Sequence, residues 1–320
     1  MLPAQAVSSI TIREEERAVP IAVPNQIAAN LEPAHAARLK TLTMPPAIAW
    51  PTVLTWLVMT GVYVASIVLA VNGVIPLWAG LLINGTIGYL TFTVVHDSLH
   101  RSISTNTRLN DVIGQSAVFM ITPYVDLRLF RWGHILHHRF ASSPKDPDYI
   151  LHGAWWTLPF RWMAIDALYL VHALRQGDKI SAKYLKSSMA MAALTFSVAG
   201  LLTWMGYGKE VLLLWFIPSR LIFLSLGFSF FWLPHVPHDV TQEENFTQAT
   251  TLRLGMEWLT APLLQNHHVH LIHHLYPGTP FYNNAKVWKL IEPELRRRDL
   301  AIQHGLSIRP TIYAAPQNAA

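Results

Sequence analysis

Half of the sixteen histidines in this sequence of 320 residues fall into three short clusters. The clusters read HDSLH at residues 96–100, HILHH at residues 134–138 and HLIHH at residues 270–274. On a helix, residues i, i+3 and i+4 share one face, so the imidazoles of an HxxHH cluster can point at one small volume. At this histidine content a given HxxHH pattern is expected by chance about 0.04 times in the chain. Two copies therefore indicate metal ligation rather than unrelated surface or interface histidines.

The donor chemistry of these clusters narrows the choice of metal. Cysteine is absent, which excludes disulfides, thiolate zinc sites, iron–sulfur clusters and a catalytic cysteine. All-nitrogen ligation suits Fe, Zn, Cu or Ni rather than Mg or Ca. Hydrolytic zinc has no support, because the sequence contains no HExxH pattern. The histidines are too many for one ion and suit two. We favour two non-haem iron ions, because the rest of the chain is built to receive a hydrocarbon.

The segments that must position the clusters are strongly apolar. Charged residues make up only 13% of the chain, against about 25% in a soluble domain. No Asp, Glu, Lys or Arg occurs between Lys40 and Asp97, which is long enough for two membrane spans of about 20 residues each. We predict spans at residues 48–71 and 77–95, separated by a turn at 72–76.

A second pair of spans is predicted at residues 187–208 and 211–233, joined by the short turn Gly206–Gly208. Arg220 interrupts the fourth span. A charge at that depth is costly, so we expect it to face the bundle or a polar cavity, paired with a substrate carboxylate or reaching lipid phosphates. The expected fold is an all-α membrane protein with four transmembrane helices in two hairpins, interfacial helices, and a cytoplasmic helical cap that holds a di-metal site.

Two weaker apolar stretches, at residues 112–122 and 155–171, are too short or too interrupted to span. Trp155 and Trp156 in the second stretch suit a segment lying at the level of the lipid headgroups. We expect three parts: an N-terminal, loosely ordered cytoplasmic tail (1–47), the membrane domain (48–290) and a C-terminal cytoplasmic tail (291–320). No cleavable signal is apparent in the first part.

Orientation follows from the distribution of Lys and Arg. The segment 97–186 carries eleven of them, the segment after Leu233 seven, and the predicted turns between spans almost none. The positive-inside rule therefore puts both termini and all three clusters in the cytoplasm, in an integral protein of a membrane such as the bacterial inner membrane. The net charge of +5 is explained in the same way, and no nucleic-acid partner is expected.

The three clusters, in this order around two apolar hairpins, resemble the histidine boxes of the membrane fatty acid desaturase and hydroxylase superfamily. PKDPDY at residues 144–149, LPH at 233–235 and HLIHHLYPGTPFY at 270–282 are similar to bacterial β-carotene hydroxylases within it. The resemblance covers about residues 95–290. Its motifs are specific for a di-metal oxygenase and leave the substrate open.

The resemblance implies nine metal ligands. They are His96, His100, His134, His137, His138, His235, His270, His273 and His274, with His238 as the alternative to His235. His268 and His270 are two apart and cannot share a helix face, so at most one of them belongs to the site, and we favour His270. Residues expected to support the ligands through hydrogen bonds are Asp97, Asp146, Asp148, Asn266 and His267. Asp146 and Asp148 also fit a simple turn. His35, His152, His172 and His304 are expected to be structural or exposed.

The implied reaction is O2-dependent oxidation of an unactivated C–H bond, with no catalytic residue beyond the metal centre. Positioning decides whether an alcohol, an alkene or, by decarboxylation, a terminal alkene is formed. No dinucleotide-binding motif is present, so an external ferredoxin, rubredoxin or cytochrome-type donor is expected. Its docking face would be basic, drawn from Arg128, Arg131, Arg139 and Arg296–Arg298, although these charges also fit ordinary positive-inside topology.

The favoured substrate is a fatty acid or fatty acyl chain, and a carotenoid ring is the alternative. Two other classes of protein were weighed. A metal transporter needs ligands near the bilayer midplane, and a membrane haem protein needs paired axial histidines within the spans. The predicted spans contain no histidine before His96, which disfavours both.

Overall fold

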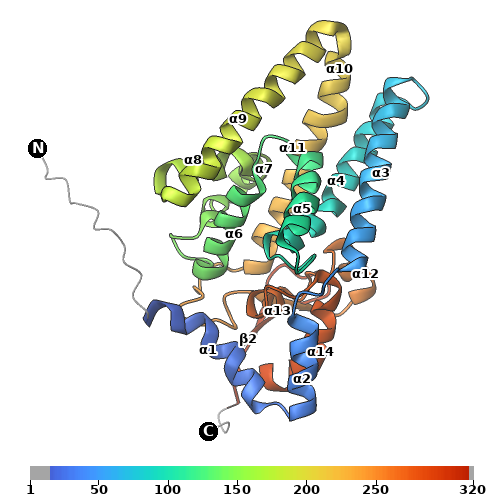
Figure 1. The fold of residues 1–320 in the computed structure, drawn as a ribbon. Coiled ribbons are helices and arrows are strands. Elements are labelled where there is room, and N and C mark those ends of the chain that lie inside the picture. The colour runs from blue at the N-terminus through green and yellow to red at the C-terminus, as the bar shows by residue number, and fades with distance from the viewer. Residues whose placement is uncertain (1–14, 317–320) are drawn as a thin grey trace, which may run out of the picture.

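The computed structural model describes residues 15–316, and Figure 1 shows two long helical pairs standing on a smaller cap. The helices of the long pairs and of the space between them are α3 (Trp50–Val71), α4 (Leu77–Leu99), α5 (Thr107–Ile121), α9 (Lys179–Leu202), α10 (Gly208–Val211) and α11 (Ile217–Leu226). Around and below them lie α1 (Glu15–Asn30), α2 (Pro33–Thr43), α6 (Leu127–Phe140), α7 (Leu158–Met163), α8 (Ile165–Gln176), α12 (Glu257–Leu263), α13 (His270–Leu275) and α14 (Asn284–Leu295).

Shorter 3₁₀ or π-helical turns are η1 (Pro147–Leu151), η2 (Trp155–Thr157), η3 (Thr203–Tyr207), η4 (Leu212–Phe216), η5 (Gly227–Trp232), η6 (Leu233–His235) and η7 (Phe281–Asn283). Three strands complete the fold: β1 (Thr251–Leu254), β2 (Leu300–His304) and β3 (Thr311–Tyr313). They form one small sheet in which β1 and β2 are parallel and β2 and β3 antiparallel. The expectation of a purely α-helical chain is wrong on this point.

Three helical segments are long and apolar enough to cross a membrane: Trp50–Val71, Leu77–Leu99 and the 57-residue stretch Lys179–His235. The first two match the predicted spans. The third segment bends back at Gly206, whose φ of 99° suits glycine and few other residues. Figure 1 shows α9 rising to this point and α10 and α11 returning beside it.

The outer faces of the long helices are apolar and uncovered. Leu54 on α3 is 56% exposed and Leu194 on α9 is 67% exposed, as expected for side chains that face lipid. The inner faces pack closely. A Cβ built on Gly88 of α4 would lie 2.1 Å from the Ile222 side chain of α11, so the absence of a side chain there lets the two pairs meet.

One face of the helix α5 packs into the bundle. Its residues Ala117 and Val118 are at most 1% exposed and share a core with Phe92 and Ile222, whereas Val112 on its other face is 65% exposed. By contrast, the segment that leads into α7 keeps Trp155 80% exposed, in agreement with an interfacial position.

Arg220 points into the bundle, where it has a partner. Its guanidinium forms an ion pair with Asp166 of α8 at 2.6 Å and also donates to the carbonyl of Met163 and the hydroxyl of Tyr124. Because its partner is a side chain of the same molecule, the arginine fastens α7 and α8 to α11.

The two expected tails pack onto the cap. Ile27, Leu39 and Leu42 of α1 and α2 are buried against Ile291 of α14, so the expectation of a loosely ordered segment is wrong over residues 23–43. Residues 1–14, which belong to the same expectation, lie outside the described part. At the other end, Ile302 of β2 is buried in this same core. The patterns of polar and apolar residues in these segments are too short to predict helices or strands from the sequence alone.

Candidate metal centre

The three histidine clusters meet because each one lies at a helix position next to the cap. His96 and His100 occupy the C-terminal end of α4. The HxxHH clusters form the last turns of α6 and the whole of α13. Helical spacing turns each set to one face, and all three faces point at the same volume.

The structure arranges eight of the imidazoles as two groups of four. The donor atoms within each group lie within 4.8 Å of one another. We call them the first quartet, which consists of His96, His100, His134 and His273, and the second quartet, which consists of His137, His235, His270 and His274. Each quartet draws on at least three separate segments of the chain, so neither exists before the chain has folded.

Ring nitrogens face each other in both quartets. In the first, the Nε2 atoms of His96 and His134 are 3.2 Å apart. In the second, the Nε2 atoms of His270 and His274 are also 3.2 Å apart. Nitrogen donors bound to one transition metal at about 2.1 Å are separated by roughly 3.0–3.4 Å, so these spacings fit shared ligation.

His138 lies between the two quartets. Its Nε2 is 2.8 Å from that of His273 and 3.2 Å from that of His134, both in the first quartet. Its ring also lies 4.3 Å, centroid to centroid, from His274 of the second quartet. Its Nε2 therefore faces the first quartet, while its ring packs against the second.

In each quartet one Nε2 atom is buried and lacks a hydrogen-bond partner among the described residues: His100 Nε2 in the first and His235 Nε2 in the second. Leaving a buried polar atom unpaired costs about 1–3 kcal/mol, so each of these nitrogens calls for a ligand. Imidazole donors in this number fit a pair of soft or intermediate transition-metal ions.

Burial keeps these rings in the state that binds metal. It lowers the pKa of His134, His270, His273 and His274 well below the ordinary value, and the neighbouring imidazoles lower it further. A neutral imidazole has a free lone pair on one nitrogen, which is the form that coordinates a metal ion.

Hydrogen bonds on the far side of the rings fix which nitrogen carries that lone pair. His235 Nδ1 donates to the carbonyl of Ala249 at 3.1 Å. His267 Nδ1 donates to the carbonyl of Gln265, so its Nε2 must accept, and it lies 2.9 Å from His96 Nδ1. The Nδ1 of both ligand candidates is thereby the protonated nitrogen, and Nε2 is left for the metal.

Gln242 performs the same task for His274. Its amide nitrogen donates to the carbonyl of His138 at 2.6 Å, so its carbonyl oxygen is free to accept from His274 Nδ1 at 3.2 Å. The sequence analysis missed this residue. Gln242 stands 32 positions before His274, and no spacing signal connects the two.

Two carboxylates support His137 of the second quartet. Its Nδ1 lies 3.1 Å from Asp146 and 3.2 Å from Asp148. Burial alone would lower the pKa of His137, but the two carboxylates outweigh it and raise this pKa to about 9. Asp148 is also buried, which raises its pKa to about 7, and it accepts a short hydrogen bond from Tyr169. Together with His137 the two aspartates form a third group with metal-ligand spacing.

Other predicted supporting residues lie elsewhere. Asp97 accepts from Thr52 Oγ1 at 2.8 Å and from the backbone N–H of Phe281 at 3.1 Å, so it ties α3 and the segment after α13 to the end of α4 rather than holding an imidazole. Asn266 has a left-handed backbone (φ 61°), and its side chain makes no hydrogen bond within residues 15–316. His238, the alternative ligand to His235, packs at a tilt against His152 with ring centroids 4.0 Å apart and belongs to neither quartet.

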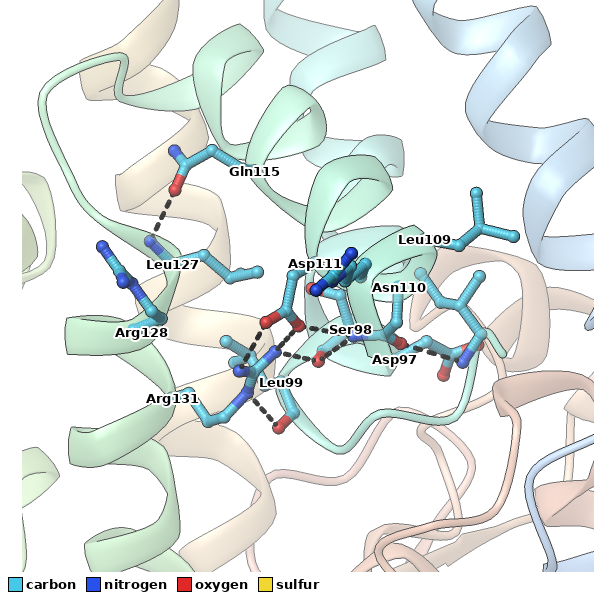
Figure 2. A network of polar contacts seen from close by, with 12 residues as sticks. Asp97, Ser98, Leu99, Leu109, Asn110, Asp111, Gln115, Leu127, Arg128 and Arg131 are labelled. Atoms are coloured by element: carbon cyan, nitrogen blue, oxygen red, sulfur yellow. Dashed lines mark hydrogen bonds and ion pairs between the residues drawn. The ribbon is translucent and has the colours of Figure 1, made fainter. Parts of the chain in front are cut away.

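Arg131 holds the C-terminal end of α4, and Figure 2 shows its contacts with Ser98, Leu99 and Asp111. Its Nε and Nη2 donate to the last carbonyls of α4, on Leu99 at 3.0 Å and Ser98 at 2.9 Å, and its Nη2 also pairs with Asp111 at 2.5 Å. Asn110 donates to the same Ser98 carbonyl. Since Arg131 is in α6, one turn before His134, it links the first and second histidine clusters. Its burial removes it from any docking face.

Comparison with known proteins agrees with these features. The family model described as "Fatty acid desaturase" matches residues 72–305. A β-carotene ketolase of Paracoccus sp. (strain PC1) is 25% identical, over 62% of this chain and 73% of its own length. A dihydrorhizobitoxine desaturase of Bradyrhizobium elkanii is 28% identical, over 62% of each chain. A chloroplastic omega-6 fatty acid desaturase of Glycine max is 25% identical, over 67% of this chain and 55% of its own length.

The family match covers well over half of the chain and includes all three histidine clusters. The chain therefore belongs to the fatty acid desaturase family.

Proposed function

We propose that this protein is a non-haem diiron oxygenase that uses O2 to oxidise an unactivated C–H bond of a long lipid. The observation that carries the proposal is the pair of imidazole quartets at the end of helices long and apolar enough to cross a membrane. Iron bound there would supply the power to activate O2, which no side chain of this protein possesses.

The residues around the metals have separate tasks. The two quartets would each hold one ion, and His138 would add its Nε2 on the side of the first quartet. The outer N–H groups of the rings donate to four acceptors, which fix the ring orientations. These acceptors are Asp146, Asp148, Gln242 and His267. The aromatic wall formed by Phe92 and Phe230, whose centroids are 4.8 Å apart, lies beside His96 and excludes water from the side that faces the apolar bundle.

The proposed arrangement in the membrane has four spans in two hairpins. The 57-residue segment would cross twice, because its two halves reverse at Gly206. The excess of Lys and Arg on the histidine side would place that side and both termini in the cytoplasm, in a bacterial inner membrane. Residues 48–290 would form the membrane domain, with the flanking segments 1–47 and 291–320 cytoplasmic.

A fatty acid or fatty acyl chain is the proposed substrate. The family and the omega-6 fatty acid desaturase relative support it. A carotenoid is the second candidate, favoured by the two ketolase relatives, of which this chain covers 73% and 70%. Hydroxylation, desaturation and oxidative decarboxylation differ only in the position of the carbon chain relative to the oxidant.

Electrons would come from an external ferredoxin, rubredoxin or cytochrome-type protein. Arg297 is exposed next to the end of α14 and, together with Arg139, Arg296 and Arg298, offers a basic surface for an acidic donor. Arg128 is also exposed, but it lies at the start of α6, at the end of that helix away from the histidines. A metal transporter is a poorer fit, because both quartets lie at the end of the spans rather than halfway along them.

Metal analysis and product analysis test the proposal together. Purified protein should contain about two non-haem irons per chain and show no Soret band. Cells that express it should convert a fed fatty acid, or else a carotenoid, only when O2 is present. His172→Ala is the matched control, because His172 is buried outside both quartets and its loss should leave iron content unchanged. Stoichiometric haem, or conversion of neither substrate, would overturn the proposal.

A further inference from the structure

An apolar cleft of about 540 Å³ opens between α3 and the α9–α10 pair. It lies at the end of the bundle opposite the histidines, where α3 ends and the chain reverses at Gly206. Its walls include Ile67, Val71, Leu194, Val198 and Leu202. This volume is within the range of sites that bind small apolar molecules.

Two polar groups interrupt the apolar lining. Glu210 contributes a carboxylate oxygen that is buried and has no hydrogen-bond partner among the described residues, and Trp215 contributes an indole N–H in the same state. A buried carboxylate oxygen without a donor is strongly disfavoured. The Glu210 oxygen accepts a hydrogen bond and the Trp215 N–H donates one. A matching ligand is therefore an amphiphile with a donor for Glu210 and, deeper in the cleft, an acceptor for Trp215.

The cleft is closed on the side of the metal centre. Phe196 stacks on Tyr124 at 5.4 Å, and Trp215 contacts both rings, at 6.1 Å from Phe196 and 6.5 Å from Tyr124. Behind them stands the ion pair between Arg220 and Asp166. A molecule in the cleft is thus separated from the quartets and would not be the substrate of the oxidation.

Two charged residues of α10 select the occupant. Glu210 lines the cleft. Lys209, which precedes it, lies outside the lining, is exposed and forms no salt bridge within residues 15–316. A carboxylate next to an ammonium group complements a zwitterion that has an amine and a phosphate. We propose that this cleft binds a phospholipid with a primary-amine headgroup, phosphatidylethanolamine, whose ammonium pairs with Glu210, whose phosphate lies near Lys209, and whose acyl chain fills the apolar space.

Native mass spectrometry of the delipidated holoprotein tests this site. The protein is titrated separately with dioleoyl phosphatidylethanolamine, phosphatidylcholine and phosphatidylglycerol. One charge-assisted hydrogen bond supports a preference for phosphatidylethanolamine of about tenfold over the other two. Equal binding of all three lipids, or capture of a fatty acid or carotenoid instead of phospholipid, would overturn the proposal.

Two substitutions locate the effect. Glu210→Gln keeps the shape but removes the charge, and it should abolish the headgroup preference while some binding remains. Ala199→Trp fills the cleft and should remove the bound lipid altogether. The control is Gly85→Leu in the apolar groove between α4 and α11, which lacks a carboxylate and where an added Cβ meets no atom within 4 Å. An unchanged preference in Glu210→Gln would refute the assignment, and iron content should be the same in all three variants.

Discussion

Each quartet consists of four imidazoles, but the groups that hold these imidazoles in place differ between the two quartets. Behind the first quartet, the imidazole of His267 lies next to His96, and the guanidinium of Arg131 donates to the last carbonyls of α4. The second has two carboxylates behind His137 and an amide behind His274. A negative second layer makes an imidazole a stronger donor. Two ions bound in the quartets would therefore be electronically unequal, although all eight ring donors are imidazoles.

The largest expected effect comes from removing one ligand from each quartet in turn. His273→Ala should empty mainly the first metal position and His274→Ala mainly the second, and each should abolish turnover because both ions are required. Iron per chain, measured beside circular dichroism of the inserted protein, checks this. Wild-type turnover from either variant would contradict the ligand assignment.

Asp146→Asn tests the charge difference between the quartets. The variant keeps the shape of the side chain but removes the charge behind His137, so iron affinity at the second position should fall 10–100-fold. Chelator competition measures it. Asp178→Asn is the control, because this carboxylate caps the start of α9 through the N–H groups of Ile180 and Ser181 and has no imidazole among its hydrogen-bond partners. Equal losses in the two variants would show that the carboxylates act only through general stability.

Arg131→Lys probes the support of the first quartet. Lysine retains the charge but cannot reach two carbonyls and Asp111 at once. The unfolding free energy should fall by about 2 kcal/mol, and iron should be lost from the first position before the second. Arg128→Lys is the matched control on the exposed face of the same helix. Thermal unfolding and iron content of the two variants decide the point, and identical behaviour would rule out a positioning role.

A further expected effect is a dependence on pH in chelator-treated protein. The pKa of His134, His270, His273 and His274 is lower in the folded state than the ordinary 6.5. Their contribution to folding stability is therefore complete above pH 6.5 and is lost below it, by up to about 1.4 kcal/mol per histidine and pH unit. His137, with a pKa raised to about 9, acts in a different range: its contribution is complete below pH 6.5 and is lost as the pH rises towards 9. Stability should therefore be highest near pH 6.5. A melting temperature in detergent that does not fall between pH 6.5 and pH 5 would contradict the burial of these rings.

Much of the architecture is predictable because its causes are local. Charge-free runs define α3 and α4 within a few residues, and the turn at Gly206 is readable from its two glycines. Convergence of the histidine clusters follows from helical spacing and from their position at one end of the spans. The pairing within the quartets was not predicted, because it depends on how α6 and α13 face each other.

The remaining features depend on contacts between distant segments. Gln242 reaches His274 only after the chain folds back over the cap, and the short β1–β2 pair joins residues about fifty positions apart. Neither of these two contacts leaves a periodic pattern in the sequence. The helices α1 and α2 were missed for a related reason, since the apolar residues that bury against α14 are few and widely spaced.

Asp97 has a mechanical consequence. One carboxylate joins the start of α3, the end of α4 and the backbone that follows the third histidine cluster. A thicker or thinner bilayer changes the tilt of a spanning helix at modest energetic cost. Any tilt of α3 would be passed through Thr52 to this carboxylate and from there to His96, its neighbour in sequence. The thickness of the bilayer would thereby change the position of His96 within the first quartet. The rate of the proposed oxidation would then depend on the membrane around the protein.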